Sequence, residues 1–378
     1  MPYYTPDPGI EAALLFSLGS SPCPLSGLTG RNIHDTDSEP PRFAFRSIFF
    51  QCAQRREAMS ILVTGGCGLV GSTLTRALVK EGEEVWVFDK WIATSRLSQI
   101  EGKVRIIQGD LANFSHILEA VKACSPRTIF HLGGMLSLPS HADPQSSFFA
   151  NVAGTFHVLE AARIFEVPKV LFTSTTATYG LDIKGTVIDD FTLQRPITMY
   201  GSTKVFGELL GRFYRSRYDL DFRAVRFPSV VGPGSKVAHI SIYNAWAVEK
   251  AFYGEPYDIF VEPEIRCPIL YFKDAARALI QLEASPREQI KTVCYLLAGI
   301  KPPISAAELV AEIKRHFPQA ALNFRPDPMA MEYHQKCQGM IFDDSKAKEE
   351  WGWRVQYDLE RTVADFYQEL RSHPERYR

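Results

Sequence analysis

Apolar and polar positions follow two different periods along this chain. From Ser60 onward, short apolar runs alternate with longer stretches in which apolar residues recur every three or four positions. The first pattern is typical of buried strands and the second of amphipathic helices. Because parallel strands need a crossover segment between them, usually a helix, this alternation predicts an α/β fold with a doubly wound parallel sheet.

The predicted elements fall into two groups that meet near residue 233. The expected strands span 60–64, 84–89, 104–108, 127–131, 168–173 and 221–227, and the expected helices of this group span 70–81, 113–124, 145–165 and 197–217. Beyond residue 233 the pattern predicts helices at 241–254, 272–283, 305–316 and 358–371. We therefore expect one domain at 59–232 and a smaller C-terminal α/β domain at 233–378, some of whose elements return to the first.

Residues 1–58 follow neither period. Prolines at positions 2, 6, 8, 22, 24, 40 and 41 interrupt any regular element there. The acidic residues of this segment, Asp7 and Glu11 among them, argue against a mitochondrial transit peptide. We expect a disordered extension, and Met59, directly before the first strand, is an alternative start of the protein.

Glycines at 65, 66, 68 and 71 separate the first strand from the first helix. This spacing suits a bound pyrophosphate: Gly65 or Gly66 makes the tight turn, Gly68 admits the ligand, and Gly71 allows close packing. The amides at the start of the helix then face the anion. Asp89 ends the second strand about 20 residues further on, where an acid accepts the hydroxyls of an adenosine ribose. The stretch predicts a dinucleotide site.

Other strands also end in polar or glycine-containing segments, which should line the same crevice. Asp110 is placed to reach the adenine edge, and capping the helix that begins near Asn113 is an equally weighted alternative. Leu132 and Gly133 leave room for a ribose.

Tyr200 and Lys204 are four residues apart and share one face of the predicted helix 197–217. A neighbouring cation lowers the pKa of a phenol, so Tyr200 is the candidate general base for a hydroxyl proton. A second hydroxyl would hold the reacting oxygen, and either Thr175 or Ser174 can supply it.

Composition narrows the function classes. A formal net charge of −1 gives no overall attraction to nucleic acid or to an anionic membrane, and no apolar run approaches the roughly 20 residues of a membrane span. The cysteines are odd in number and scattered, at Cys23, Cys52, Cys67, Cys124, Cys267, Cys294 and Cys337. We expect reduced thiols in a cytoplasmic protein and, because the nine histidines are equally dispersed, no metal site.

Taken together, the glycine loop, Asp89, the Ser/Thr strand end and the Tyr200–Lys204 helix resemble the extended short-chain dehydrogenase/reductases. The resemblance implies a Rossmann domain, a smaller C-terminal substrate domain, NAD(P), and Thr175, Tyr200 and Lys204 as catalytic residues. It also implies the cofactor contacts Gly65, Gly66, Gly68, Leu69, Val70, Gly71, Asp89, Lys90, Asp110, Leu111, Asn151 and Val230. NAD is preferred to NADP because Asp89 would repel a ribose phosphate, although Lys90 and Arg96 lie nearby.

Two kinds of enzyme compete within that family. Sugar-nucleotide epimerases carry an Asn in the segment that here reads Arg226 to Pro233 without one, and an Arg that falls on Cys267. The separated segments around Thr175, Tyr200 and 218–228, with those at 268–271 and 342–353, are similar instead to the short-chain type of L-threonine 3-dehydrogenase. That similarity implies oxidation of a small hydroxy acid, best L-threonine to 2-amino-3-oxobutanoate, with Ser137 and Thr176 near the substrate.

The epimerase remains the alternative, and a non-catalytic dinucleotide sensor is a third possibility that the catalytic residues disfavour. The resemblance further implies a homodimer in which helices 145–165 and 197–217 form a four-helix interface. Phe206, Leu209, Leu210 and Phe213 share one face of the second helix and would be its exposed ridge. We expect Trp246 and the aromatic residues near it to pack in the core, and an aromatic substrate box is the weaker alternative.

Overall fold

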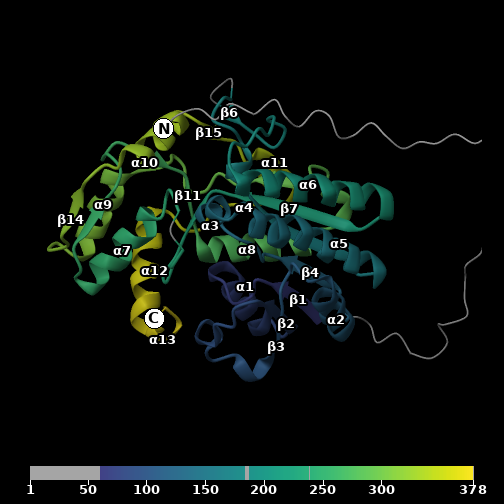
Figure 1. Ribbon diagram of the computed structural model, residues 1–378. Coiled ribbons are helices and arrows are strands. Elements are labelled where there is room, and N and C mark those ends of the chain that lie inside the picture. Colours follow the sequence, from purple (N-terminus) through teal and green to yellow (C-terminus); the bar gives the residue numbers. More distant parts are fainter. Residues whose placement is uncertain (1–59, 184–186, 238, 378) are drawn as a thin grey trace, which may run out of the picture. The chain divides into compact units, whose positions relative to one another are not determined.

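A computed structural model describes residues 60–183, 187–237 and 239–377 of this protein. The expected disordered extension and Met59 lie outside the described residues. The central sheet has seven strands, all parallel, in the order β12-β7-β5-β4-β1-β2-β3 (Figure 1). The doubly wound parallel sheet predicted from the alternation of elements is confirmed.

The six predicted strands are present, with boundaries within two residues of expectation. They are β1 (Ser60–Thr64), β2 (Glu84–Asp89), β3 (Val104–Gln108), β4 (Thr128–His131), β5 (Lys169–Thr175) and β7 (Asp221–Phe227). The seventh strand, β12 (Cys294–Leu296), was not predicted. It has only three residues and pairs with β7 alone, at the edge of the sheet. So short an apolar run gives little strand signal by itself, and the pairing with β7 is what makes it a strand.

Alternate residues of the strands face two separate helix layers. Ile61 and Val63 belong to a core with α1 (Leu69–Lys80) and α8 (Phe272–Ala284). Leu62, between them, belongs to the opposite core, which the helices on the other face cover: α2 (Phe114–Cys124), α5 (Gly154–Ile164) and α6 (Met199–Tyr218). Both faces are therefore buried, as a parallel sheet requires.

The expected boundary at 232/233 is crossed by two elements. Helix α8 packs beside α1 on the central sheet, and β12 joins the sheet itself. Both come from the sequence after residue 233, so the C-terminal part contributes to the central sheet and its helix layer as well as to its own core.

The predicted helix 145–165 is wrong as a continuous element. A short α4 (Pro144–Ser147) passes into a π-helical turn, η3 (Phe148–Ala153), before α5 begins. Such turns insert one extra residue and are frequent at functional sites. Here the turn contains Asn151, which is buried. A further short helix, α3 (Ser137–Ala142), precedes it and was not predicted.

The rest of the C-terminal part forms its own core. The predicted helices appear as α7 (Tyr243–Tyr253), α9 (Ala306–His316) and α12 (Leu359–Ser372). Three further helices of this part were not predicted: α10 (Pro328–Cys337), α11 (Ser345–Trp351) and α13 (Pro374–Tyr377). Four two-stranded sheets were not predicted either, and two of them pair a strand from before residue 233 with one from after it. They are β8 (Ser229–Val231) with β11 (Ile269–Tyr271), β6 (Val187–Ile188) with β15 (Ile341–Phe342), β9 (Tyr257–Ile259) with β14 (Leu322–Phe324), and β10 (Arg266–Cys267) with β13 (Ile304–Ser305). None of the described helices has the length and apolar character needed to cross a membrane.

Candidate active site

The glycine loop after β1 folds tightly onto a neighbouring strand end. Gly65 has φ +71°, and a Cβ there would lie 2.7 Å from the backbone nitrogen of Gly133. A Cβ on Gly71 would lie 2.2 Å from the Gly65 carbonyl oxygen, so any side chain at either position forces the loop apart. Gly68 precedes α1 without a side-chain cap, which leaves the amides of Leu69 and the following residues to meet an anion.

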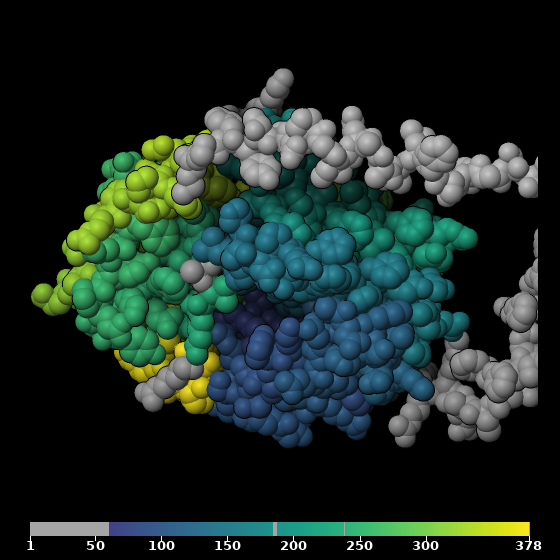
Figure 2. All heavy atoms as spheres, viewed as in Figure 1, coloured from purple at the N-terminus to yellow at the C-terminus, as the bar shows by residue number. Residues whose placement is uncertain are grey.

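Three strand ends converge at this loop, as predicted for one crevice. A Cβ on Gly133 would approach Leu111 Cδ1 to 2.8 Å and the Gly65 nitrogen to 3.3 Å, so the ends of β1, β3 and β4 meet there. Leu132 packs beside the same core as α1. In Figure 2 the dark purple atoms at the start of the described chain lie at the bottom of a recess between the blue, teal and green parts.

Asp89, at the end of β2, is held by the loop that it faces. Its Oδ2 accepts a hydrogen bond from the Cys67 amide at 3.0 Å, and its Oδ1 accepts one from the Trp91 amide at 3.2 Å. Both bonds fix the carboxylate beside the glycine turn, where the adenosine ribose was predicted.

Lys90 forms an ion pair with Asp110 at 2.8 Å. Burial tends to raise the pKa of Asp110, but hydrogen bonds from Lys90 and the Ala112 amide outweigh it and hold the pKa below its usual value. The alternative that Asp110 caps α2 is wrong, because the N-cap is Asn113, whose side chain accepts from the Ser115 amide. Asp110 instead closes a turn directly before that cap.

Tyr200 and Lys204 lie on successive turns at the start of α6. Thr198 caps the helix through the Gly201 amide at 3.1 Å. A Cβ on Gly201 would stand 2.2 Å from the carbonyl oxygen of Ala177, so glycine is required for the helix to approach the end of β5 this closely. This packing brings the first turn of α6, which carries Tyr200, against the residues that directly follow Thr175.

The electrostatics of the pair differ from the sequence expectation. Burial raises the pKa of Tyr200 to about 12, where a lowered pKa was expected. The Lys204 Nζ is 5.8 Å from the Tyr200 ring centroid and donates to the Thr173 carbonyl oxygen at 2.9 Å. Burial also lowers the pKa of Lys204 to about 8, against the opposing effect of Glu208.

The two candidate hydroxyls at the end of β5 point to opposite sides of the strand. Ser174 donates to a carboxylate oxygen of Glu208, which is buried on α6. Thr175 accepts from the Ala177 amide at 3.1 Å, and its own proton can still be donated to a ligand. Thr175 is therefore the strand-end hydroxyl available to a substrate. Thr176 follows it, and Ser137 begins α3, which packs against α6.

Behind this strand end lies a buried ion pair that sequence reasoning missed. Arg226 and Glu208 are 2.6 Å apart and are 5% and 1% exposed. The available signals were the position of Glu208, four residues after Lys204 on α6, and an arginine inside an otherwise apolar strand. The pair braces β7 against α6.

Asn151 is placed differently from the cofactor contact that was expected. Its Oδ1 accepts from the Met135 amide at 2.7 Å, while its Nδ2 donates to the Met135 carbonyl at 3.0 Å and to Thr203 Oγ1 at 3.2 Å. The side chain therefore ties the loop after β4 to α6. The π-helical turn supplies the displacement that lets it reach both.

His131, at the end of β4, joins this buried polar system and was not singled out from the sequence. Its Nδ1 lies 2.7 Å from Thr64 Oγ1 and its Nε2 3.1 Å from Thr155 Oγ1, which in turn donates to the Asn151 carbonyl. Burial lowers the pKa of His131 to about 3, so the ring is neutral near pH 7. It links the glycine-loop strand to the π-helical turn.

Acidification should destabilise the protein through His131. An unfolded chain binds a proton at this ring near pH 6.5, whereas the folded chain does so only near pH 3, so stability should fall as the pH drops through that interval. The effect should be on the order of a few kcal/mol, and His131→Gln should flatten the slope. Urea unfolding between pH 4 and 7 measures it. The exposed His141, changed to Gln, is the control that should leave the slope unaltered; an equal slope in both variants would contradict this reading.

The position at which epimerases carry an arginine holds a neutral group here. Cys267 is 4% exposed, burial raises the pKa of its thiol to about 11, and Ser241 and Asn244 hydrogen-bond it. The adjacent Arg266 instead contacts Glu308 at 3.0 Å and the Pro303 carbonyl at 2.7 Å. Neither residue therefore offers a free cation at this position.

Val230, a predicted cofactor contact, lies on β8 and packs against both the α1 core and the C-terminal core. It thus stands where the two cores meet. Within the described residues, no group of three or more His, Cys, Asp or Glu side chains gathers as a metal site.

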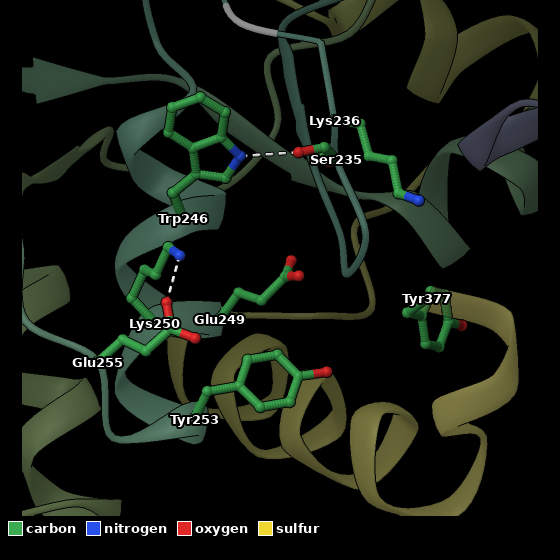
Figure 3. A pocket seen from close by; sticks show the side chains of 8 residues that line it. All are labelled: Ser235, Lys236, Trp246, Glu249, Lys250, Tyr253, Glu255 and Tyr377. Atoms are coloured by element: carbon green, nitrogen blue, oxygen red, sulfur yellow. Dashed lines mark hydrogen bonds and ion pairs between the residues drawn. The ribbon is translucent and has the colours of Figure 1, made fainter.

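A cavity of about 630 Å³ lies elsewhere, between α7 and the C-terminal end of the chain (Figure 3). Its lining residues are Ser235, Lys236, Trp246, Glu249, Lys250, Tyr253, Glu255 and Tyr377. Trp246 donates to the Ser235 carbonyl at 2.7 Å, and Lys250 pairs with Glu255. None of the predicted cofactor-binding or catalytic residues lines this cavity. Trp246, expected in the core with an aromatic substrate box as the alternative, packs partly buried against the C-terminal core and also lines the cavity.

Comparison with known proteins agrees with this geometry. Bovine mitochondrial L-threonine 3-dehydrogenase is 26% identical over 321 residues, covering 84% of each chain. The L-threonine dehydrogenase structure from Clostridium difficile superposes with a TM-score of 0.75 at 26% identity, covering 83% of this chain and 98% of that one. UDP-glucose 4-epimerase from Thermotoga maritima, 23% identical, shares the fold with a TM-score of 0.73, covering 83% and 99%.

The family described as NAD dependent epimerase/dehydratase matches residues 61–295, from the first residues of β1 to β12. That range contains the glycine loop, Asp89, Thr175, Tyr200 and Lys204, which the fold gathers at one crevice. On this sequence match and this architecture, the chain belongs to the NAD-dependent epimerase/dehydratase family, the extended short-chain dehydrogenase/reductases.

Proposed function

We propose that this protein oxidises a small hydroxy acid with NAD, and that its substrate is L-threonine, which it converts to 2-amino-3-oxobutanoate. The observation that carries the choice of substrate class is the buried, neutral Cys267 where an epimerase places a cation. A sugar nucleotide brings a diphosphate, and burying that charge without a cation is unfavourable. L-Threonine has one carboxylate and one ammonium group and no net charge, so its demand for a protein cation is smaller.

The residues present fit NAD. The loop from Gly65 to Gly71 would take the pyrophosphate, because side chains are excluded there and the amides of α1 are uncapped. Asp89 would accept the adenosine ribose hydroxyls. When bound, NAD supplies the hydride acceptor and a positive charge beside the phenol.

Proton transfer then falls to Tyr200. Thr175 would donate its free proton to the β-hydroxyl oxygen of the substrate and hold it near the phenol. Tyr200 removes the hydroxyl proton as the hydride leaves the β-carbon. Lys204 keeps positive charge one helical turn away, and its bond to the Thr173 carbonyl fixes the ammonium there. The phenolate form of Tyr200, disfavoured by burial alone, is favoured by these positive charges.

The preference for NAD over NADP rests on Asp89 and on the ion pair that occupies the nearby Lys90. Lys90 is paired with Asp110, and Arg96 donates to the Gly234 carbonyl. Lys90 is therefore engaged, and the Asp89 carboxylate would repel the charge of a ribose phosphate.

A homodimer through α5 and α6 is part of the proposal. Phe156 on α5 and Phe206, Leu209 and Phe213 on α6 are between 41% and 59% exposed. Leu210, expected in the same ridge, packs instead toward the α2–α5–α6 core. Large apolar side chains gathered on neighbouring helices favour an interface.

The test is a nicotinamide absorbance assay. NAD and NADP should each be offered with L-threonine, other 3-hydroxy acids and UDP-sugars in parallel. NADH formed with L-threonine, and little NADPH, is the expected result. Interconversion of UDP-sugars without net NADH would establish the epimerase alternative, and binding of NAD with no turnover of any substrate would favour the dinucleotide sensor.

A further inference from the structure

The ammonium group of Lys204 is contacted by two consecutive residues of β5. Its Nζ lies over the ring of Phe172, 4.6 Å from the ring centroid, and donates a hydrogen bond to the Thr173 carbonyl oxygen at 2.9 Å. Phe172 and Lys204 are only 1% and 4% exposed. A cation within roughly 6 Å of an aromatic face is attracted to the ring, and the attraction is stronger where water is excluded. The two residues therefore form a buried cation–π contact.

The fold holds the ring of Phe172 against α6. A Cβ on Gly207 would lie 2.6 Å from Phe172 Cζ, so glycine is what lets the ring lie this close to the helix. Gly207 comes three residues after Lys204 and shares its face of α6. Within the sheet, the rings of His131 and Phe222 flank Phe172, with centroids 5.6 Å and 6.1 Å away. These neighbours restrict the ring and keep its face toward the ammonium.

Among the described residues, no carboxylate is bonded to the Lys204 ammonium. Glu208, the acidic residue one turn further along α6, is bonded to Arg226 and Ser174 instead. An ammonium has three N–H donors, and within the described part of the chain that of Lys204 makes one hydrogen bond, to Thr173. A ring face attracts the ammonium as a whole, so this contact leaves the other donors available to a ligand.

We propose that Phe172 is a positioning residue of the oxidation reaction, which holds the Lys204 ammonium near Tyr200 with the face of its ring. This rests on the proposed function, in which Lys204 supplies positive charge to the phenol. The Lys204 Nζ is 5.8 Å from the Tyr200 ring centroid, so the charge lies close to the group that must lose its proton. If the ring attracted the ammonium less, the phenolate form of Tyr200 would lose part of its support.

The test replaces Phe172 with phenylalanines that carry one, two or three fluorine atoms. Fluorine withdraws electrons from the ring face while the apolar ring keeps nearly the same shape. The kcat for NAD reduction with L-threonine should fall stepwise, by about tenfold with three fluorines, while KM for L-threonine stays within about twofold of wild type. Phe222, which is 0% exposed and has no cation over its ring among the described residues, is the matched control. Trifluorination there should leave kcat unchanged, and equal losses at both positions, or no graded loss at Phe172, would overturn the proposal.

Two further measurements separate positioning from a purely structural role. In the trifluorinated Phe172 protein, the ascending limb of kcat/KM against pH should move to higher pH, because the phenolate is less supported. An unmoved limb with a reduced rate would mean that the ring only packs. NMR of isotope-labelled lysine Cε atoms, with the Lys204 signal assigned through Lys204→Met, should show Lys204 titrating at lower pH in the same variant. An unshifted titration would contradict the cation–π contact whatever the substrate, whereas absence of NADH formation by wild type would refute the proposed function itself.

Discussion

Replacing Tyr200 with phenylalanine should lower kcat for NAD reduction by about a hundredfold or more while NAD binding stays nearly unchanged. The substitution keeps the ring in its place at the start of α6 and removes only the oxygen that takes the proton. Stopped-flow or steady-state absorbance measures kcat, and quenching of protein fluorescence measures NAD affinity. Tyr218→Phe, at the far end of the same helix, is the matched control and should retain full activity.

Two results would count against Tyr200 as the base. Weakened NAD binding with little loss of kcat would assign the phenol a role in holding the cofactor. Full activity would place proton transfer on another group. The pKa of about 12 in this structure makes the experiment informative, because the phenol needs its positive neighbours before it can act at neutral pH.

Replacing Glu208 with alanine should destabilise the protein by about 3 to 5 kcal/mol. The change leaves the guanidinium of Arg226 on β7, a residue that is 5% exposed, buried without its carboxylate partner. It also removes the acceptor of the Ser174 hydroxyl. Urea unfolding followed by circular dichroism gives the free energy of unfolding.

The control for Glu208 is an ion pair of the same length on the surface. Glu332 and Lys336 on α10 are 2.6 Å apart, and their side chains are 70% and 50% exposed. Glu332→Ala should change stability little, because water screens the pair. Equal effects of the two substitutions would mean that burial of the Glu208–Arg226 pair carries no special weight.

The central strands and the catalytic residue types follow from the sequence because their signals are local. Each of β1 and β2 is an apolar run with a turn beside it, and the pairing Leu62↔Trp86 brings such runs together without further information. The glycine spacing and the four-residue spacing of Tyr200 and Lys204 likewise express the geometry of one turn and one helix. These features determined the fold class, the family and the candidate catalytic residues.

Only the tertiary structure decided the features that depend on distant partners. β12 is a strand because β7 lies beside it, and the π-helical turn exists where Asn151 reaches both Met135 and Thr203. The choice of Thr175 over Ser174 required knowing where Glu208 lies. Burial reversed the expected direction of the Tyr200 pKa, because desolvation is set by the whole fold and no spacing along the chain encodes it.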